Sequence, residues 1–141
     1  MDHVIQTFRA FSEEMRLRIL MLLIGGELCV CDLMAIFGES QSKVSRHLAY
    51  LKHSGLVKGT RVGRWMHYSL EESMEEVAAA QLRFMEDHLS SLPRFRQDME
   101  KLGEVQRKKL CEGAPGRPPA LRSGRRRNIG KKQRVPSAGS K

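Results

Sequence analysis

Residues 40–57 read SQSKVSRHLAYLKHSGLV, and they contain the clearest structural pattern in the chain. Ser40 is a preferred helix N-cap. Val44, Leu48 and Leu51 then recur at helical spacing, which predicts a helix with one apolar stripe. Because each residue turns a helix by about 100°, the opposite face carries small, amide, hydroxyl and basic side chains. Such side chains suit the major groove of DNA, where Gln can address adenine and Arg can address guanine.

The neighbouring segments complete a helix-turn-helix with a wing. Residues 30–37 carry apolar side chains at helical spacing, and Gly38-Glu39-Ser40 predicts the tight turn into the next helix. Leu56–Thr60 and Trp65–Leu70 predict two strands joined by residues 61–64. The expected fold is therefore mainly α with a small β-hairpin, a winged helix-turn-helix.

Four further helices are expected around this motif. The first covers about residues 4–11, and the second starts after Ser12 as N-cap, with two glutamates in its first turn, and stops at Gly25-Gly26. After the wing, residues 71–92 and a segment from Pro93 to about residue 110 also have helical periodicity.

The chain of 141 residues has a net charge of +9, which is unevenly distributed. Residues 113–141 contain nine Lys or Arg and no acidic residue, whereas the first 112 residues contain 16 of each sign. The tail is also rich in Gly, Pro and Ser, so we expect a disordered extension that either grips nucleic acid or is simply solvated. The expected organisation is a winged helix-turn-helix domain in residues 1–92, a C-terminal helix in 93–112 and a basic tail in 113–141.

Within the folded part, the basic excess lies on the expected DNA face. Residues 38–68 carry six Lys or Arg against Glu39 alone. Lys43 suits a phosphate contact, and the two wing arginines suit the DNA backbone or minor groove. His47 is expected to touch either DNA or a neighbouring helix. The candidate DNA-binding residues are Ser40, Gln41, Ser42, Lys43, Ser45, Arg46, His47, Arg61 and Arg64.

Two cysteines stand one residue apart in CVCDL, residues 29–33. Side chains two residues apart within a helix point about 200° away from each other, so such a pair inside a helix could not bind one ion. At a helix start the geometry is freer, and we expect Cys29 as N-cap with Asp32 reaching back to the cap amide. Backbone N–H groups there favour anions, which predicts lowered pKa values for both thiols and a soft-metal site. The alternative is two small thiols packed under the helix.

Other features favour a cytoplasmic protein with no membrane partner. The longest apolar run, Ile19–Ile24, is far shorter than the roughly 20 residues of a membrane helix, and the first residues do not form a signal peptide. Cys29, Cys31 and Cys111 are then expected to be thiols rather than a disulfide framework. A thiol oxidoreductase is disfavoured, and no enzyme activity is expected, because the C-x-x-C motif of that class is missing.

Four segments resemble the ArsR/SmtB family of metal-sensing transcriptional repressors, in its arsenic-responsive branch. They are FRAFSEEMRLRILMLL (8–23), ELCVCDLM (27–34), the quoted stretch 40–57 and RVGRWMHYSL (61–70). The resemblance implies a homodimer that binds double-stranded operator DNA when empty and releases it when arsenite or antimonite binds Cys29 and Cys31. It also implies a dimer interface formed by residues 2–11 and 72–92.

The resemblance leaves the third ligand of the metalloid open. Some arsenic-responsive relatives carry a third cysteine at the position of Met34. Without it, Cys111, a small thiol or water would complete the site. Two alternative functions remain, a thiol redox sensor that joins Cys29 to Cys31 in a strained disulfide and a sensor of another soft metal.

Overall fold

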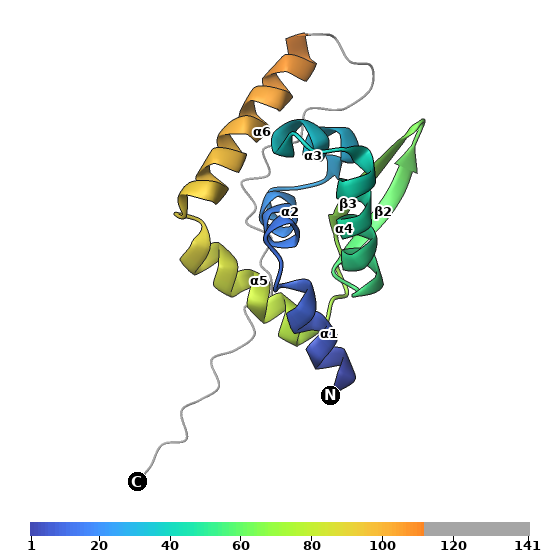
Figure 1. The fold of residues 1–141 in the computed structure, drawn as a ribbon, viewed down its shortest axis with the longest axis vertical. Helices are drawn as coiled ribbons and strands as arrows, with labels where there is room; N and C mark the ends of the chain where they lie inside the picture. Colours follow the sequence, from blue (N-terminus) through green and yellow to red (C-terminus); the bar gives the residue numbers. More distant parts are fainter. Residues whose placement is uncertain (112–141) are drawn as a thin grey trace.

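The computed structural model describes residues 1–111, and only the backbone of the last two of these. The basic tail predicted at 113–141 and the Cys111 side chain lie outside the described residues. Figure 1 shows the order of elements along the chain. They are α1 (Asp2–Ala10), α2 (Glu14–Ile24), β1 (Leu28–Cys29), α3 (Val30–Phe37), α4 (Gln41–His53), β2 (Val57–Val62), β3 (Trp65–Leu70), α5 (Glu76–Leu89) and α6 (Pro93–Cys111).

The core lies where α2, α3 and α4 meet. The predicted apolar stripe of α4, formed by Val44, Leu48 and Leu51, is fully buried. It packs in one cluster with Leu33 of α3 and Ile19 of α2, which are equally inaccessible to solvent. The helix-turn-helix is thus confirmed, and its polar face is left outside.

The turn between α3 and α4 follows the sequence closely. Gly38 ends α3 with φ of +62°, a left-handed conformation that favours glycine. Ser40 then caps α4, because its hydroxyl accepts a hydrogen bond from the Lys43 backbone N–H at 3.3 Å. These two residues fix the angle at which α4 leaves the core.

Three predicted boundaries were wrong. The N-cap of α2 is Glu13, whose carboxylate accepts from the Arg16 N–H at 2.9 Å, while the Ser12 hydroxyl donates to α1 instead. The hairpin is longer than expected, since Val62 pairs with Trp65 and only two residues form the turn. The helix expected over 71–92 runs from Glu76 to Leu89, because the chain leaving β3 first makes a turn.

The sheet contains a strand that the sequence did not predict. Its order is β1-β3-β2, and both neighbours run antiparallel to β3. In the short β1, Leu28 lies opposite Tyr68 and Cys29 lies opposite His67. The backbone of Cys29 is therefore joined directly to a strand of the wing.

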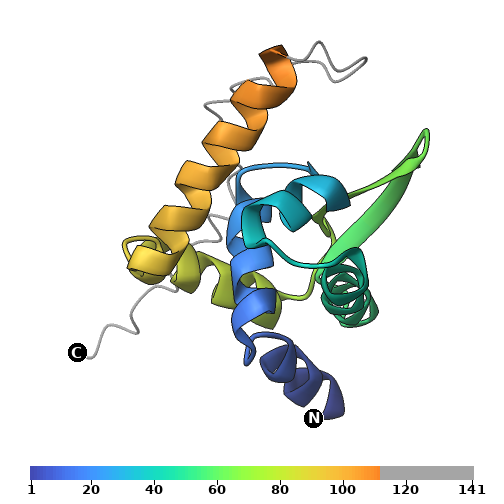
Figure 2. The ribbon, with the colours of Figure 1, turned by 45° about the horizontal axis from the view of Figure 1, so that its top comes forward.

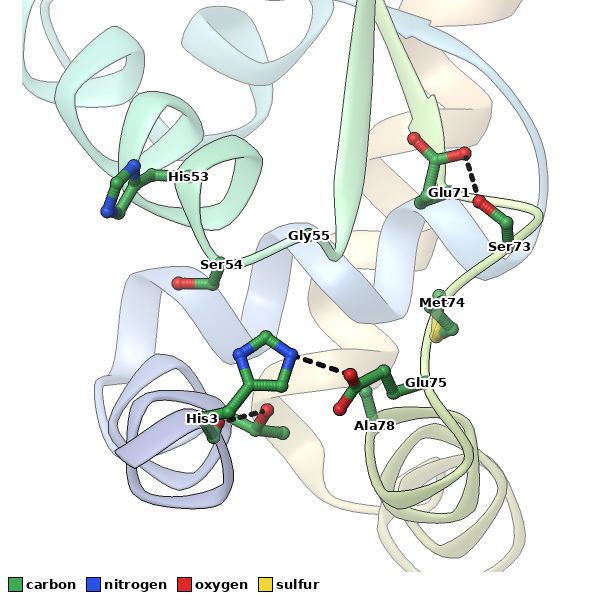
Figure 3. A pocket seen from close by; sticks show the side chains of 10 residues that line it. His3, His53, Ser54, Gly55, Glu71, Ser73, Met74, Glu75 and Ala78 are labelled. Carbon is green, nitrogen blue, oxygen red and sulfur yellow. Dashed lines mark hydrogen bonds and ion pairs between the residues drawn. The ribbon is translucent and has the colours of Figure 1, made fainter. Parts of the chain in front are cut away.

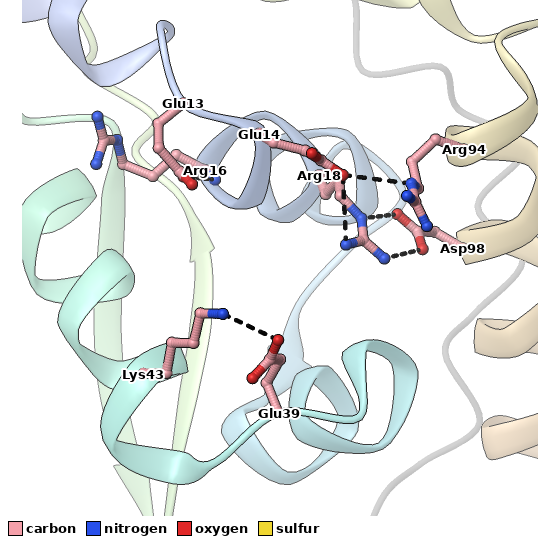
Figure 4. Close-up of polar contacts among 8 residues, drawn as sticks. All are labelled: Glu13, Glu14, Arg16, Arg18, Glu39, Lys43, Arg94 and Asp98. Carbon is pink, nitrogen blue, oxygen red and sulfur yellow. Dashed lines mark hydrogen bonds and ion pairs between the residues drawn. The ribbon is translucent and has the colours of Figure 1, made fainter.

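Helix α6 folds back along the body of the molecule. Figures 1 and 2 show it running beside α2, with its C-terminal end near α3. Phe95 and Leu102 of α6 are buried against the core side. The Asp98 carboxylate accepts two hydrogen bonds from the Arg18 guanidinium, both 2.8 Å long (Figure 4). This bidentate pair fixes α6 against α2.

Candidate metal site and nucleic-acid interface

The Cys29-x-Cys31 pair lies at the start of α3, where the sequence placed it. Cys29 is the N-cap, with extended backbone angles, and its Sγ accepts from the Cys31 backbone N–H at 3.3 Å. The Asp32 carboxylate accepts from the Cys29 N–H at 2.9 Å, so the predicted reciprocal cap is confirmed. Both cysteines are free thiols, Cys29 buried and Cys31 partly exposed.

The protonation of Cys29 differs from the prediction. Burial raises the pKa of the Cys29 thiol to about 11, and a hydrogen bond with the Cys31 thiol acts in the same direction. The negative charge of Asp32 also opposes ionisation. The expected lowering of the pKa by the helix start is therefore outweighed at Cys29, whose thiol is protonated at neutral pH.

The structure adds Lys109 of α6 to this site. Its ammonium forms an ion pair with the Asp32 carboxylate and lies 3.7 Å from the Cys31 Sγ. Burial opposes the charge on Lys109, but the hydrogen bond and attraction from Asp32 outweigh it and raise the pKa of Lys109. Phe95, Asp98, Leu102, Val105 and Lys109 recur every three or four residues along α6. Lys109 thus continues the row of inward-facing positions on α6, and this spacing could have indicated from the sequence that Lys109 faces the body of the protein.

The candidate DNA-binding residues gather on α4 and the wing. Six of them are exposed and the other three are partly buried. The exposed ones are Ser40, Gln41, Ser42, Arg46, Arg61 and Arg64. Lys43 forms an ion pair with Glu39, the one acidic residue of 38–68, at 2.9 Å (Figure 4), so the other five basic residues of this region have no acidic partner within it.

Of the two contacts expected for His47, with DNA or with a neighbouring helix, the structure shows one with the start of α2. Its Nδ1 lies 3.5 Å from the Glu13 carboxylate at the start of α2. Burial lowers the pKa of His47, the Glu13 carboxylate partly opposes this, and the positive charges of Arg16 and Arg46 add to the lowering. The His47 side chain thus connects α4 to the start of α2.

A small cavity of about 140 Å³ lies between α4 and the wing. Gln41 and Ser45 line it from α4, and Arg61 and Arg64 line it from the wing. Val30, which stands between the two cysteines, lines the same cavity. Trp65 also borders it and is 52% exposed, although the sequence analysis did not single it out. The cysteine segment therefore contacts the surface that carries the DNA-binding candidates.

A larger cavity of about 260 Å³ lies elsewhere, between α1, the end of α4 and the turn before α5. Figure 3 shows His3 beside Glu75, and these two side chains are 2.7 Å apart. Among the side chains of residues 1–109, no group of three His, Cys, Asp or Glu is arranged to hold a metal ion. In the same part of the chain, no helix has the length and apolar character needed to cross a membrane.

Comparison with known proteins agrees with this arrangement. The model of the family described as bacterial regulatory protein, arsR family, matches residues 13–58, which include α2, α3 and α4. The arsenical resistance operon repressor of Bacillus subtilis is 41% identical over 73 residues, which are 51% of this chain and 68% of that protein. The chain belongs to the ArsR family.

Two further comparisons extend this result. The arsenical resistance operon repressor of Escherichia coli is 47% identical over 76 residues, 53% of this chain and 65% of that protein, so this chain spans just under two thirds of its length. A homodimeric winged helix-turn-helix DNA-binding domain from Mycobacterium bovis has a TM-score of 0.52 at 33% identity, covering 63% of this chain and 83% of that one. The chain thus has a winged-helix fold and belongs to a family of bacterial regulatory proteins.

Proposed function

We propose that this chain is a homodimeric repressor that binds operator DNA through α4 and the wing and releases it when trivalent arsenic or antimony binds Cys29 and Cys31. The observation that carries the proposal is the position of the two thiols. They lie side by side at the junction of β1 and α3, and the residue between them faces the cavity bordered by the DNA-binding candidates. The names of the E. coli and B. subtilis relatives support arsenic as the inducer.

The DNA side of the proposal rests on shape and charge. Helix α4 presents a polar face next to a two-stranded wing, and Arg46, Arg61 and Arg64 are exposed on the two elements. In winged-helix proteins of this class, the second helix of the motif enters the major groove and basic residues contact the phosphates. Gln41, Ser42, Ser45 and Arg46 are then the base-reading candidates.

The homodimer is supported by apolar side chains that remain exposed on α1 and α5. Ile5 and Phe8 of α1 are 42% and 49% exposed, and Phe84 of α5 is 54% exposed. Figure 1 shows α1 and α5 together at one end of the molecule, away from the wing. An apolar surface shared by two adjacent helices favours burial against a second copy of the chain.

The chemistry of arsenous acid, As(OH)₃, suits two protonated thiols. Each thiol proton leaves with one hydroxide as water, so two S–As bonds replace two As–O bonds and no electrons are transferred. Buried Cys29, with its raised pKa, can react in this way without releasing a net proton. The third arsenic ligand remains a hydroxide or a further thiol, and Cys111 stays a candidate for it.

Release of DNA would follow from the contacts of Cys29. Binding through its Sγ removes the sulfur acceptor of the Cys31 N–H, which disturbs the first turn of α3. That turn is paired to His67 of β3 on one side and borders the cavity next to Gln41 on the other. Ligand and DNA then oppose each other with a reciprocal coupling free energy, typically about 1–3 kcal/mol.

The test is a DNA-binding titration with the segment immediately upstream of the chain's own gene. A Cys29→Ser, Cys31→Ser double variant should bind this DNA like the wild type but no longer release it with arsenite. A Cys111→Ser variant tests the third ligand separately: release at the wild-type arsenite concentration would show that Cys111 does not complete the site. Release of the double variant by arsenite would refute the assignment.

A second soft metal remains an alternative inducer. A relative named as a cadmium resistance regulatory protein CadC homolog, from Staphylococcus aureus, is 39% identical over 70 residues, 49% of this chain and 58% of that protein. The same DNA titration is repeated with Cd²⁺ and, for the redox-sensor alternative, with hydrogen peroxide. Of arsenite, Cd²⁺ and hydrogen peroxide, only the true inducer should release the DNA at low concentration.

A further inference from the structure

We infer that Lys109 makes the cysteine site selective for an uncharged trivalent hydroxide over a divalent cation. This inference rests on the proposed function and names the feature of α6 that sets the preference. It concerns residues 32 and 109, which are 77 positions apart in the sequence and meet only because α6 folds back onto α3.

The contact between Lys109 and Asp32 is formed by a part of α6 that follows two positions packed against the body of the protein. Asp98 binds Arg18 through two hydrogen bonds of 2.8 Å, and Leu102 is buried one turn further along α6. Lys109 follows on the same face of the helix and reaches both Asp32 and Cys31. Because Asp98 and Leu102 fix α6 at two earlier positions, the Lys109 ammonium is held next to the cysteine pair.

Lys109 changes what the site offers to a cation. Asp32 is the carboxylate next to the two thiols, and carboxylate and thiolate together suit borderline metals. Among the described residues these three groups are not arranged to hold an ion, so a divalent ion would have to draw the Asp32 carboxylate away from its present partners. One oxygen of Asp32 accepts from the Cys29 N–H, and the other faces Lys109. The carboxylate is thus paired with a cation, and a dication at the sulfurs would also be repelled by the ammonium 3.7 Å from Cys31.

An uncharged metalloid hydroxide meets neither obstacle. Arsenous acid brings no positive charge, so the ammonium does not repel it, and it needs no carboxylate ligand. Its remaining hydroxyl can instead accept a hydrogen bond from Lys109. The pairing of Asp32 with Lys109 therefore lowers the affinity of the site for a divalent cation and leaves its affinity for arsenite nearly unchanged.

The test compares Cd²⁺ and arsenite binding in the full-length protein, followed by ultraviolet absorbance of the sulfur–ligand bonds. In Lys109→Met, the affinity for Cd²⁺ should rise at least about ten-fold, as expected when one unit charge is removed about 5 Å from a dication in a largely aqueous medium. The affinity for arsenite should change less than about three-fold. Lys109→Arg should keep the wild-type preference, because it keeps the charge.

Two controls separate this inference from a general effect of charge or folding. Lys108→Met removes the same charge from an exposed neighbour and should leave both affinities unchanged. The Cys29→Ser, Cys31→Ser variant shows which signal comes from the pair. If the wild type binds arsenite at the pair but Lys109→Met binds Cd²⁺ no better than Lys108→Met does, the inference is wrong while the proposed function stands. If the wild type binds no arsenite at the pair, both are overturned.

Discussion

Asp98→Asn is expected to lower the free energy of unfolding by about 3–5 kcal/mol, because it leaves a buried guanidinium without its carboxylate. The Asp98 side chain is 2% exposed and that of Arg18 is 11% exposed. The guanidinium of Arg18 also lies over the Phe37 ring, 4.7 Å from its centroid. Arg18 is thus enclosed by α3 and α6, and its other acidic neighbour, the exposed Glu14 carboxylate 3.9 Å away, only partly compensates for the loss of the buried one.

The structure contains a matched exposed pair on the same two helices. Arg94 lies 3.3 Å from Glu14, and their side chains are 59% and 65% exposed (Figure 4). Exposed pairs of this kind contribute about 0–1 kcal/mol. Arg94→Gln should therefore change the stability by less than about 1 kcal/mol, although it removes the same type of contact.

Urea unfolding followed by circular dichroism measures both effects, and a double-mutant cycle isolates the pair. Arg18→Met combined with Asp98→Asn should be more stable than the sum of the two single losses predicts, because neither charge is then left alone. A loss below about 1 kcal/mol for Asp98→Asn, or simple additivity in the cycle, would show that the pair does not fix α6.

Three further outcomes are expected. Gly38→Ala should cost about 1–2 kcal/mol in thermal or urea unfolding, since a Cβ there meets no atom within 4 Å and the cost comes from the φ of +62° alone. Phe84→Glu should shift the protein towards monomer in analytical ultracentrifugation, whereas the exposed Glu86→Gln should not. Between pH 8 and 10 the wild type should lose about 1 kcal/mol of stability relative to Cys29→Ala, because the unfolded thiol ionises near its usual pKa and the folded one only near 11; equal pH profiles in urea unfolding would contradict this.

The sequence predicted the helix-turn-helix well because its signals are local. Val44, Leu48 and Leu51 repeat at helical spacing, and Gly38 and Ser40 mark the turn, so no distant contact is needed to place α4. The reciprocal cap of Cys29 and Asp32 was predicted for the same reason, since its two members are three residues apart.

The errors arose where a distant or competing contact decides the outcome. Ser12 and Glu13 can both cap α2, and the Ser12 hydroxyl is used by Arg9 of α1. Strand β1 has only two residues and exists because β3 lies beside it, 38 positions later at Cys29 and His67. The raised pKa of Cys29 likewise depends on burial, which the spacing of two cysteines does not reveal.

Only two residue pairs join β1 to β3, and they connect the two-cysteine segment to the wing. Because the contact between the strands is this small, a single substitution at Leu28 or Tyr68 can strengthen or weaken it. In a regulator of the kind proposed, such a change would move the inducer concentration at which the response begins, while the atoms that bind ligand and DNA stay the same. The sensitivity of the switch and the identity of its signal could therefore evolve separately.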